Sequence, residues 1–285
     1  MKRRLLGCFC VLVSGVVFAS GATAEQPAEV SMVVTGNIVI APDGSVRSHA
    51  IDHPDKLPPA VNTIIDKTVA AWKFVPVVVD GEPKATQAKV GLRLIAVSAE
   101  HGEFTVRVSG ASFASSAPSQ RLHVKAINVL PRYPLGAQRA RAGGTAYVLL
   151  KVGQQGQVLD SAVEQVNLTV RGNSRQMTYL RGAFATAALA SAKNRTYDVP
   201  TSGPQAHDGY WIVRESVKFT LNPLGPSRTI RAEYGQWQPY VPGPREVVSW
   251  LDGRQLGEGS PLTIPDGDLT PLGSGPQLLS SLSDS

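Results

Sequence analysis

The sequence predicts an α+β protein built from small antiparallel sheets, each covered on one face by a helix. Two observations predict this class. The chain contains the same series of patterns twice, a β-hairpin, then a helix, then a further strand, and each hairpin has a turn that includes glycine. Between the hairpin and the last strand of each copy, apolar residues recur at the three- and four-residue spacing of an amphipathic helix.

The first copy begins with a hairpin whose strands are expected over residues 33–41 and 46–51, joined by the turn at Pro42-Asp43-Gly44-Ser45. A helix is expected next, because an apolar stripe continues through Val61, Ile64, Ile65, Val69 and Trp72. A strand over residues 88–97 follows, in which Val90, Leu92 and Leu94 share one face. Gly102 then allows a hairpin into residues 104–108.

The second copy opens with a short helix between Pro134 and Gly143, since proline suits a first helical turn and glycine the residue beyond the C-cap. The elements expected after it are strands over residues 145–152 and 157–166, a helix over residues 174–193 and a last strand over residues 210–221. Each copy has too few strands to form more than one small sheet.

These patterns divide the chain into five segments. They are a signal peptide (1–24), a first domain (25–110), a linker (111–119), a second domain (120–225) and a Pro/Gly-rich C-terminal extension (226–285). The aromatic residues of the extension are expected to dock on the second domain. About the last 15 residues are expected to be disordered.

The N-terminus has the pattern of a cleavable secretory signal. Basic residues at positions 2–4 precede an apolar run over residues 5–19, and Ala22-Thr23-Ala24 supplies the small residues of a cleavage site. The sequence therefore predicts a periplasmic protein that begins at Glu25. The alternative is an inner-membrane anchor formed by residues 5–24. Both cysteines, Cys8 and Cys10, lie inside the signal, so the mature chain would have no disulfide or cysteine metal site.

Charge is unevenly distributed along the chain. The formal net charge of +6 includes three basic residues of the signal. Residues 104–159 contain seven basic residues and no acidic one. Such a segment favours an anionic partner, and a solvated face without any partner explains it equally well. No nucleic-acid partner is expected.

The second copy resembles the C-terminal domain of the energy transducer TonB. The resemblance is carried by Pro131-Arg132-Tyr133-Pro134, by Gly143-Gly144, by the turn at Gly156-Gln157-Val158 and by the helix with Phe184. The first copy keeps Pro42-Asp43-Gly44 and a Trp-x-Phe-x-Pro exit from its helix at Trp72, Phe74 and Pro76. The second copy lacks that tryptophan, and the chain lacks the Pro-rich rod of full TonB proteins.

The resemblance implies a non-enzymatic protein-binding module linked to transport across the outer membrane. In that family the last strand of the domain accepts an extended segment of an outer-membrane receptor by strand addition. The partner-binding residues that the resemblance implies are Trp211, Val213, Glu215, Val217 and Phe219 of the last strand. Arg132, Tyr133, Arg139 and Arg141 are further candidates for partner binding, and the three arginines suit an anionic cell-wall polymer. The polar set of that strand, which includes Arg214, Ser216 and Lys218, is expected to face solvent beside a free edge.

The sequence offers one cluster of residues that resembles a metal site. His49, Asp52 and His53 lie close in the sequence, but on a strand the two histidines share one face and the aspartate points to the other. Solvent-exposed polar residues are the expected reading, with no metal and no cofactor. The chain has no nucleophile elbow, no His-Glu-x-x-His and no phosphate-binding loop, so an enzyme is not expected. The alternative to the TonB-like function is a periplasmic scaffold or envelope protein that binds anionic cell-wall polymer.

Overall fold

The computed structural model describes residues 29–79, 81–98, 104–221, 234–251, 269–273 and 275–282. Within these ranges the chain forms mostly antiparallel strands with few helices, which confirms the α+β class. The expected signal peptide, residues 1–24, and the expected turn at Gly102 lie outside the described ranges. Among the helices that are described, none combines the length and the apolarity needed to cross a membrane.

Residues 29–115 form a main sheet with one α-helix and a small β3–β4 hairpin, and we call this unit the first module. The elements are β1 (Glu29–Ile40), β2 (Val46–Ile51), α1 (Pro59–Ala70), the short β3 (Val78–Val79) and β4 (Glu82–Pro83), β5 (Thr86–Ser98) and β6 (Phe104–Ser115). The sheet has the order β2-β1-β5-β6. The expected apolar stripe is confirmed, because Val61, Ile65 and Val69 of α1 share one core with Leu92 and Leu94 of β5.

Residues 123–219 form the second module. Its elements are β7 (His123–Ile127), α2 (Leu135–Arg139), β8 (Gly144–Gly153), β9 (Val158–Leu168), α3 (Ser174–Ala192), β10 (Arg195–Asp198) and β11 (Tyr210–Phe219). The main sheet has the order β9-β8-β11, and β7 and β10 form a separate two-stranded ribbon. Met177, Leu180 and Phe184 of α3 are buried against this sheet. Asn173 caps the helix by accepting a hydrogen bond from the backbone N–H of Gln176.

The two modules repeat one contact at their hairpin turns. Gly44 accepts a backbone hydrogen bond from Phe74 at 2.8 Å, and Gly156 accepts one from Tyr197 at 2.8 Å. Both glycines have positive φ, and a Cβ at either position would overlap the carbonyl oxygen of the same partner. The expected hairpin turns are therefore confirmed. Each turn is hydrogen-bonded to the segment that comes directly after the helix of its module.

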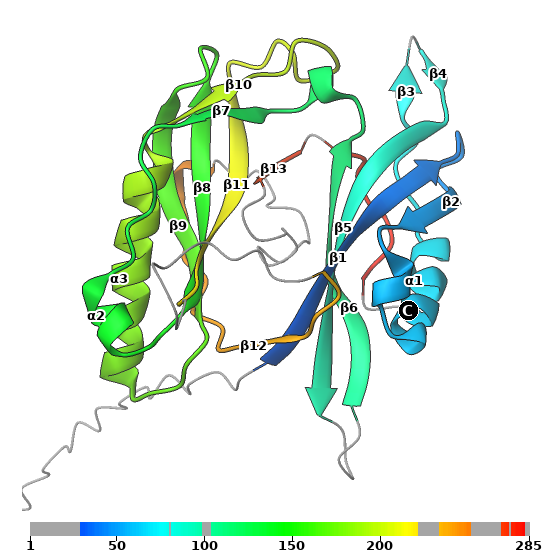
Figure 1. Cartoon of the computed structure of the whole chain (residues 1–285). Coiled ribbons are helices and arrows are strands. Elements are labelled where there is room, and N and C mark those ends of the chain that lie inside the picture. The colour runs from blue at the N-terminus through cyan, green and yellow to red at the C-terminus, as the bar shows by residue number, and fades with distance from the viewer. Residues whose placement is uncertain are drawn as a thin grey trace, which may run out of the picture.

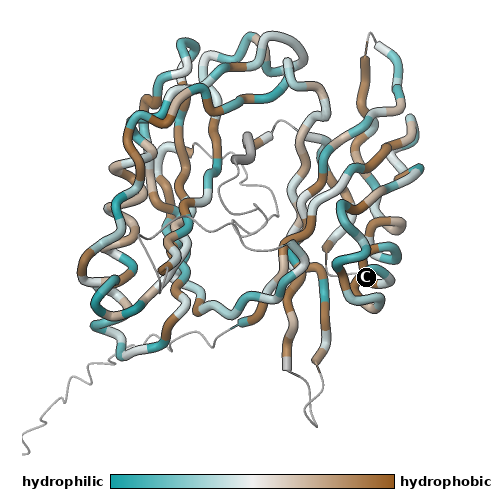
Figure 2. Tube along the Cα trace, viewed as in Figure 1, coloured by the Kyte–Doolittle hydropathy of each residue, from teal (hydrophilic) through white to brown (hydrophobic). Residues whose placement is uncertain are grey.

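The two sheets face each other with the helices on the outside. In Figure 1, α3 covers the outer face of the second sheet and α1 covers the outer face of the first. Figure 2 shows apolar residues concentrated along the strands of both sheets. Each sheet therefore has one face that packs on its own helix and one face turned toward the other module.

The C-terminal extension lies between the two modules and pairs with strands of both. Its first described strand, β12 (Gln238–Tyr240), pairs with β1, and the next residue, Val241, bridges Leu168 at the end of β9. Val248 and Leu251, at the short 3-10 helix Ser249–Leu251, pack on Ile212 of the second sheet. The strand β13 (Leu269–Pro271) then pairs with β11.

Three expectations about the chain outside the two repeats are corrected. The strand β6 continues to Ser115, so the connection after it starts later than the linker expected over residues 111–119. Residues 275–282 are not disordered, because Leu278 bridges Phe74 and packs on the first core. The aromatic residues Tyr234 and Trp237 pack on the first core, whereas Trp250 packs on the second module as expected. These contacts join residues about 200 positions apart, which local sequence patterns do not encode.

Candidate functional site

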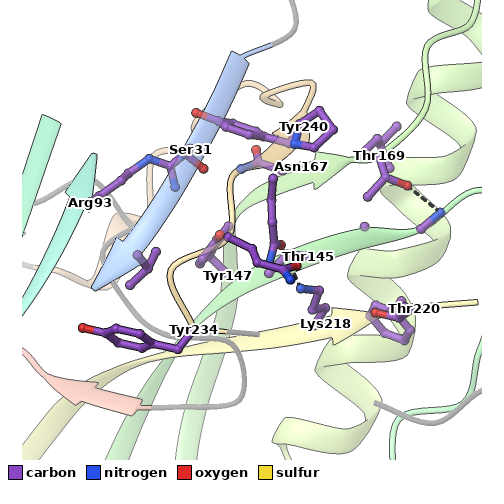
Figure 3. Close-up of a pocket in the computed structure, with 18 of the residues that line it drawn as sticks. Ser31, Arg93, Thr145, Tyr147, Asn167, Thr169, Lys218, Thr220, Tyr234 and Tyr240 are labelled. Carbon is purple, nitrogen blue, oxygen red and sulfur yellow. Dashed lines mark hydrogen bonds between the residues drawn. The ribbon is translucent and has the colours of Figure 1, made fainter. Parts of the chain in front are cut away.

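A cavity in the described structure lies between the two modules, and we call it the inter-module cavity. It has a volume of about 740 Å³, which is in the size range of small-molecule binding sites. Strands of both sheets and the extension contribute to its wall (Figure 3). The polar residues that line it are Ser31, Thr35, Asp52, His53, Lys56, Arg93, Arg141, Thr145, Tyr147, Asn167, Thr169, Lys218, Thr220, Tyr234, Gln236, Gln238 and Tyr240.

The first module contributes Arg93, which lies on the inner face of β5. Its neighbours Leu92 and Leu94 point into the core under α1, and alternation along the strand turns Arg93 the other way. Arg93 is almost completely buried, and its guanidinium lies 4.6 Å from the centre of the Tyr240 ring. The Tyr240 hydroxyl donates a hydrogen bond to the carboxylate of Glu29. Burial is the main reason why the pKa of Tyr240 is raised, so the phenol is neutral and remains a donor.

The second module contributes Lys218 from the end of β11. The Lys218 ammonium donates a hydrogen bond to Oε1 of Gln238 at 2.9 Å, which joins β11 to β12. Tyr147 of β8 forms a small cluster with Tyr240, so aromatic rings from the second module and from the extension meet at the cavity. Figure 3 shows Tyr147 between the Arg93 side and the Lys218 side of the cavity.

The end of the cavity near β2 is organised around Thr35. Its hydroxyl donates to Oδ2 of Asp52 at 2.6 Å, and its backbone N–H donates to the Tyr234 hydroxyl at 3.2 Å. That hydroxyl in turn donates to the Thr35 carbonyl oxygen, at 3.2 Å. Burial raises the pKa of Tyr234. The His53 ring packs edge-on against Tyr234 with 5.5 Å between centroids. Asp52 is therefore engaged, and it is the only acidic side chain among the lining residues described.

Arg141 reaches the cavity from the end of α2. Its φ of 51° places it in the left-handed region, although glycine was expected to end this helix at position 143. The backbone N–H of Arg141 donates to Gln138 and that of Ala142 to Ala137, so this residue closes the helix. The next turn is fixed by the Gly143 N–H, which donates to the Thr169 hydroxyl at 3.0 Å. Arginine therefore occupies the left-handed position after the helix, where glycine is the usual residue.

The lining is strongly biased toward positive charge. The lining contains one carboxylate, that of Asp52, and four basic side chains, which are Lys56, Arg93, Arg141 and Lys218. Hydroxyl and amide groups supply most of the remaining polar atoms. Partly enclosed walls strengthen electrostatic attraction, because low-dielectric surfaces screen charge less than bulk water does. The cavity is therefore suited to a ligand that carries negative charge and several hydrogen-bonding groups.

Most residues expected to bind a partner lie elsewhere. Trp211, Val213, Glu215, Val217 and Phe219 are all buried on the face of β11 that packs on α3, so their side chains contact the module's own core. Tyr133 is half-buried between Phe184 and Phe219, and burial raises its pKa to about 12. Arg132 and Arg139 are exposed on the outer side of the module. Of the expected set, Arg141 and Phe219 line the cavity.

The expectation of a solvent-facing polar face on β11 is wrong. Arg214 and Ser216 are buried, since the extension covers the inner face of the second sheet. Arg214 donates two hydrogen bonds, of 2.6 and 2.9 Å, to the fully buried carboxylate of Glu164. Arg245 of the extension donates to the same carboxylate at 2.7 Å. One carboxylate with two guanidinium partners thus fastens the extension to the second sheet.

The outer edge of β11 is not free along its whole length. Val213, Arg214 and Glu215 pair with β13, so the strand expected to accept a partner already has one over these residues. From Ser216 to Phe219, β8 is the only strand that pairs with β11 in the described ranges. The equivalent strand of the first module, β5, is paired with β6 from Ala88 to Ser98.

The three residues considered for a metal site have separate partners. His49 Nε2 lies 2.7 Å from Oδ1 of Asp66 on α1, Asp52 accepts from Thr35, and His53 packs on Tyr234. No group of three metal-ligating side chains is found in the described part of the chain.

The sequence pattern missed Arg93, Lys218 and Tyr240. One signal for Arg93 was available, because a lone arginine interrupts an otherwise apolar run, Val90-Gly91-Leu92-Arg93-Leu94-Ile95. A charge at the middle of a buried strand requires a partner and therefore marks a contact beyond the local fold. Nothing comparable distinguishes Tyr240 within the Pro- and Gly-rich extension.

The fold and the site together define a class of protein. It is an α+β chain whose two sheets face each other across a cavity with a basic lining, and its C-terminal extension pairs with both sheets. Comparison with protein-family models, with curated proteins and with solved structures finds no match to the chain.

Proposed function

We propose that this chain is a non-enzymatic periplasmic binding protein that holds an anionic, hydrogen-bonding ligand in the inter-module cavity. The observation that carries the proposal is the charge of the lining, in which four basic side chains accompany a single carboxylate that is already hydrogen-bonded. The basic groups come from both modules, so a bound anion contacts both at once. The extension holds the modules in this arrangement before binding, which reduces the entropy cost of association.

The ligand class we propose is a carboxylate-bearing fragment of cell-wall polymer. Such a fragment carries negative charge together with sugar hydroxyl and amide groups. The lining offers hydroxyl groups at Thr145, Thr169 and Thr220 and amide groups at Asn167 and Gln236. For this ligand class we favour the cell-wall function over a role in transport.

We also propose that both modules are of the TonB C-terminal type. The support is the repeated order of hairpin, helix and strand, with the same register in both copies. Ile40 pairs with Val46 across the first hairpin, and Val152 pairs with Val158 at the same positions relative to the turn glycine of the second. The repeated turn contacts at Gly44 and Gly156 support the same relationship.

The test of the cavity is a calorimetric titration of the full chain. The ligand is a peptidoglycan fragment with free carboxylates, compared with the same fragment after its carboxylates have been amidated. Wild type should prefer the charged fragment, and Lys56→Gln with Lys218→Gln should weaken binding at least about tenfold, which is ~1.4 kcal/mol. Lys67→Gln with Lys89→Gln, at exposed positions outside the lining, is the matched control. Equal affinity for both fragments, or equal loss in both double variants, contradicts the proposal.

A second candidate function is strand addition at the part of β11 that β13 leaves uncovered. Its support is that β13 pairs over only three residues, with no other described strand on that edge of Ser216–Phe219. Extended receptor peptides should then bind the full chain, and Thr270→Pro, which removes a backbone N–H from β13, should raise their affinity. Absence of peptide binding by both proteins excludes this function.

A further inference from the structure

The outer side of the second module carries exposed apolar residues on the segment between β7 and α2, which runs alongside α3. Asn128 donates from its side chain to the Asn194 carbonyl oxygen beyond the end of α3, and Ser191 donates to the Val129 carbonyl oxygen one turn earlier. Further along, Gly136 of α2 lies against the hydroxyl of Tyr179, near the start of α3. The chain between β7 and α2 therefore runs along the outside of α3 (Figure 1).

This placement gathers large apolar side chains that nothing in the described structure covers. Leu130 is 73% exposed, Leu135 is 69% exposed and Tyr179 is 59% exposed. Ile127 and Val129 are also exposed. Four of these residues lie between the end of β7 and the start of α2, and the fifth is on α3, which this segment contacts. Such a set differs from the scattered apolar residues of an ordinary surface and indicates an interaction surface.

Exposed basic residues lie on the same elements as this apolar set. Arg132, Arg139, Arg171 and Arg175 are all exposed, on the same segment, on α2 or at the start of α3. Between Phe104 and Tyr197 the sequence has twelve basic residues and two acidic ones, Asp160 and Glu164. Glu164 is fully buried and ion-paired, so Asp160 is the one exposed carboxylate of that stretch.

We propose that this face, which we call the α2–α3 face, docks on the surface of a membrane rich in anionic phospholipid. Leu130 and Leu135 would enter the boundary between headgroups and acyl chains while the arginines contact lipid phosphates. The exposed leucines decide for a lipid surface over an anionic polysaccharide, because a hydrated polymer offers them no apolar environment. The proposal is independent of ligand binding in the inter-module cavity, since Leu130, Leu135 and the four arginines lie outside its lining.

The experiment is vesicle co-sedimentation of the full chain. Vesicles of phosphatidylcholine mixed with phosphatidylglycerol are compared with vesicles of phosphatidylcholine alone. Wild type should sediment with the anionic vesicles only, and added salt should weaken this binding. Leu130→Ser with Leu135→Ser should abolish it. Arg132→Gln with Arg139→Gln should weaken it by roughly fivefold for each arginine.

Two control variants change the same kinds of residue on the first module. Val78→Ser alters an apolar residue that is 60% exposed, and Lys67→Gln removes an exposed positive charge. Both should bind like wild type. All substituted side chains are exposed, and an unchanged melting temperature verifies folding. Absence of binding by wild type overturns the proposal. Loss in the arginine variant with full binding by the leucine variant also overturns it, and indicates a hydrated anionic polymer instead.

Discussion

Arg195 and Glu215 form an ion pair inside the core of the second module, where the first module has Trp72 and Val90. Ser45 bridges Lys73 and Gln157 bridges Thr196, so the residues before these partners, Trp72 and Arg195, are equivalent. Val90 and Glu215 are equivalent because they pair with Gly36 and Val148, which lie at the same distance from the two turn glycines. Both charged side chains are almost fully buried, and burial lowers the pKa of Arg195. The Tyr197 hydroxyl donates to the other oxygen of Glu215 at 3.2 Å. The missing tryptophan of the second copy is thus replaced by a charged pair.

Removing one partner of this pair should be costly. Arg195→Ala leaves the Glu215 carboxylate buried without its countercharge, so the free energy of unfolding should fall by about 3–5 kcal/mol. The triple change Arg195→Met, Glu215→Val and Tyr197→Phe, which imitates the apolar first module, should be neutral or stabilising. Urea denaturation measures both. A triple variant as unstable as Arg195→Ala would mean that the charges themselves hold this core together.

The two turn glycines should be far more sensitive than another glycine of similar backbone conformation. An alanine Cβ at Gly156 would lie 1.9 Å from the Tyr197 carbonyl oxygen, and one at Gly44 would lie 2.1 Å from that of Phe74. Either substitution should cost at least about 3 kcal/mol, because the turn must move away from the helix exit. Gly81→Ala is the control, since Gly81 also has positive φ but open space around it, and should cost about 1–2 kcal/mol. Similar losses at all three sites would assign the effect to backbone strain alone.

Much of the repeated fold could be predicted from the sequence. The expected strand at residues 46–51 and the helix at 174–193 agree with β2 and α3 to within one residue, since both have clear turn or capping signals and regular periodicity. The ribbon of β7 and β10 was missed, because its strands are short and pair across about 70 residues. Alternation along β11 was recognised correctly, but it could not show that the extension covers the polar face. For the same reason the cavity, which three separate segments build, was not predicted.

The C-terminal leucines should contribute to stability in proportion to their contact with the first module. Leu278 and Leu282 pack against the first core, whereas Leu279 is 63% exposed. Replacing Leu278 and Leu282 together with serine should lower the free energy of unfolding by about 1–3 kcal/mol. Leu279→Ser should have no measurable effect. A folded chain of unchanged melting temperature in the double variant would restore the expectation of a disordered tail.

Stability should decrease in alkaline solution because of Tyr197. Burial raises the pKa of this phenol from 10 to about 12, while nearby Arg195 acts in the opposite direction. The contribution is fully present below pH 10 and is lost as the pH rises to 12, because the unfolded chain releases the proton first. The loss is about 2–3 kcal/mol for two pKa units. Urea denaturation across this range should show a smaller pH dependence for Tyr197→Phe, and an identical dependence would contradict the assignment.

Binding of a ligand between the two modules can be observed directly through the amide chemical shifts of the full chain. The titrant is the peptidoglycan fragment with free carboxylates. The largest shifts should fall on both walls of the cavity, at Thr35 and Arg93 of the first module and at Thr145 and Lys218 of the second. Tyr240 of the extension should shift with them. Shifts confined to one module, or gathered along β11 between Val213 and Val217 or on the α2–α3 face, would contradict binding between the modules.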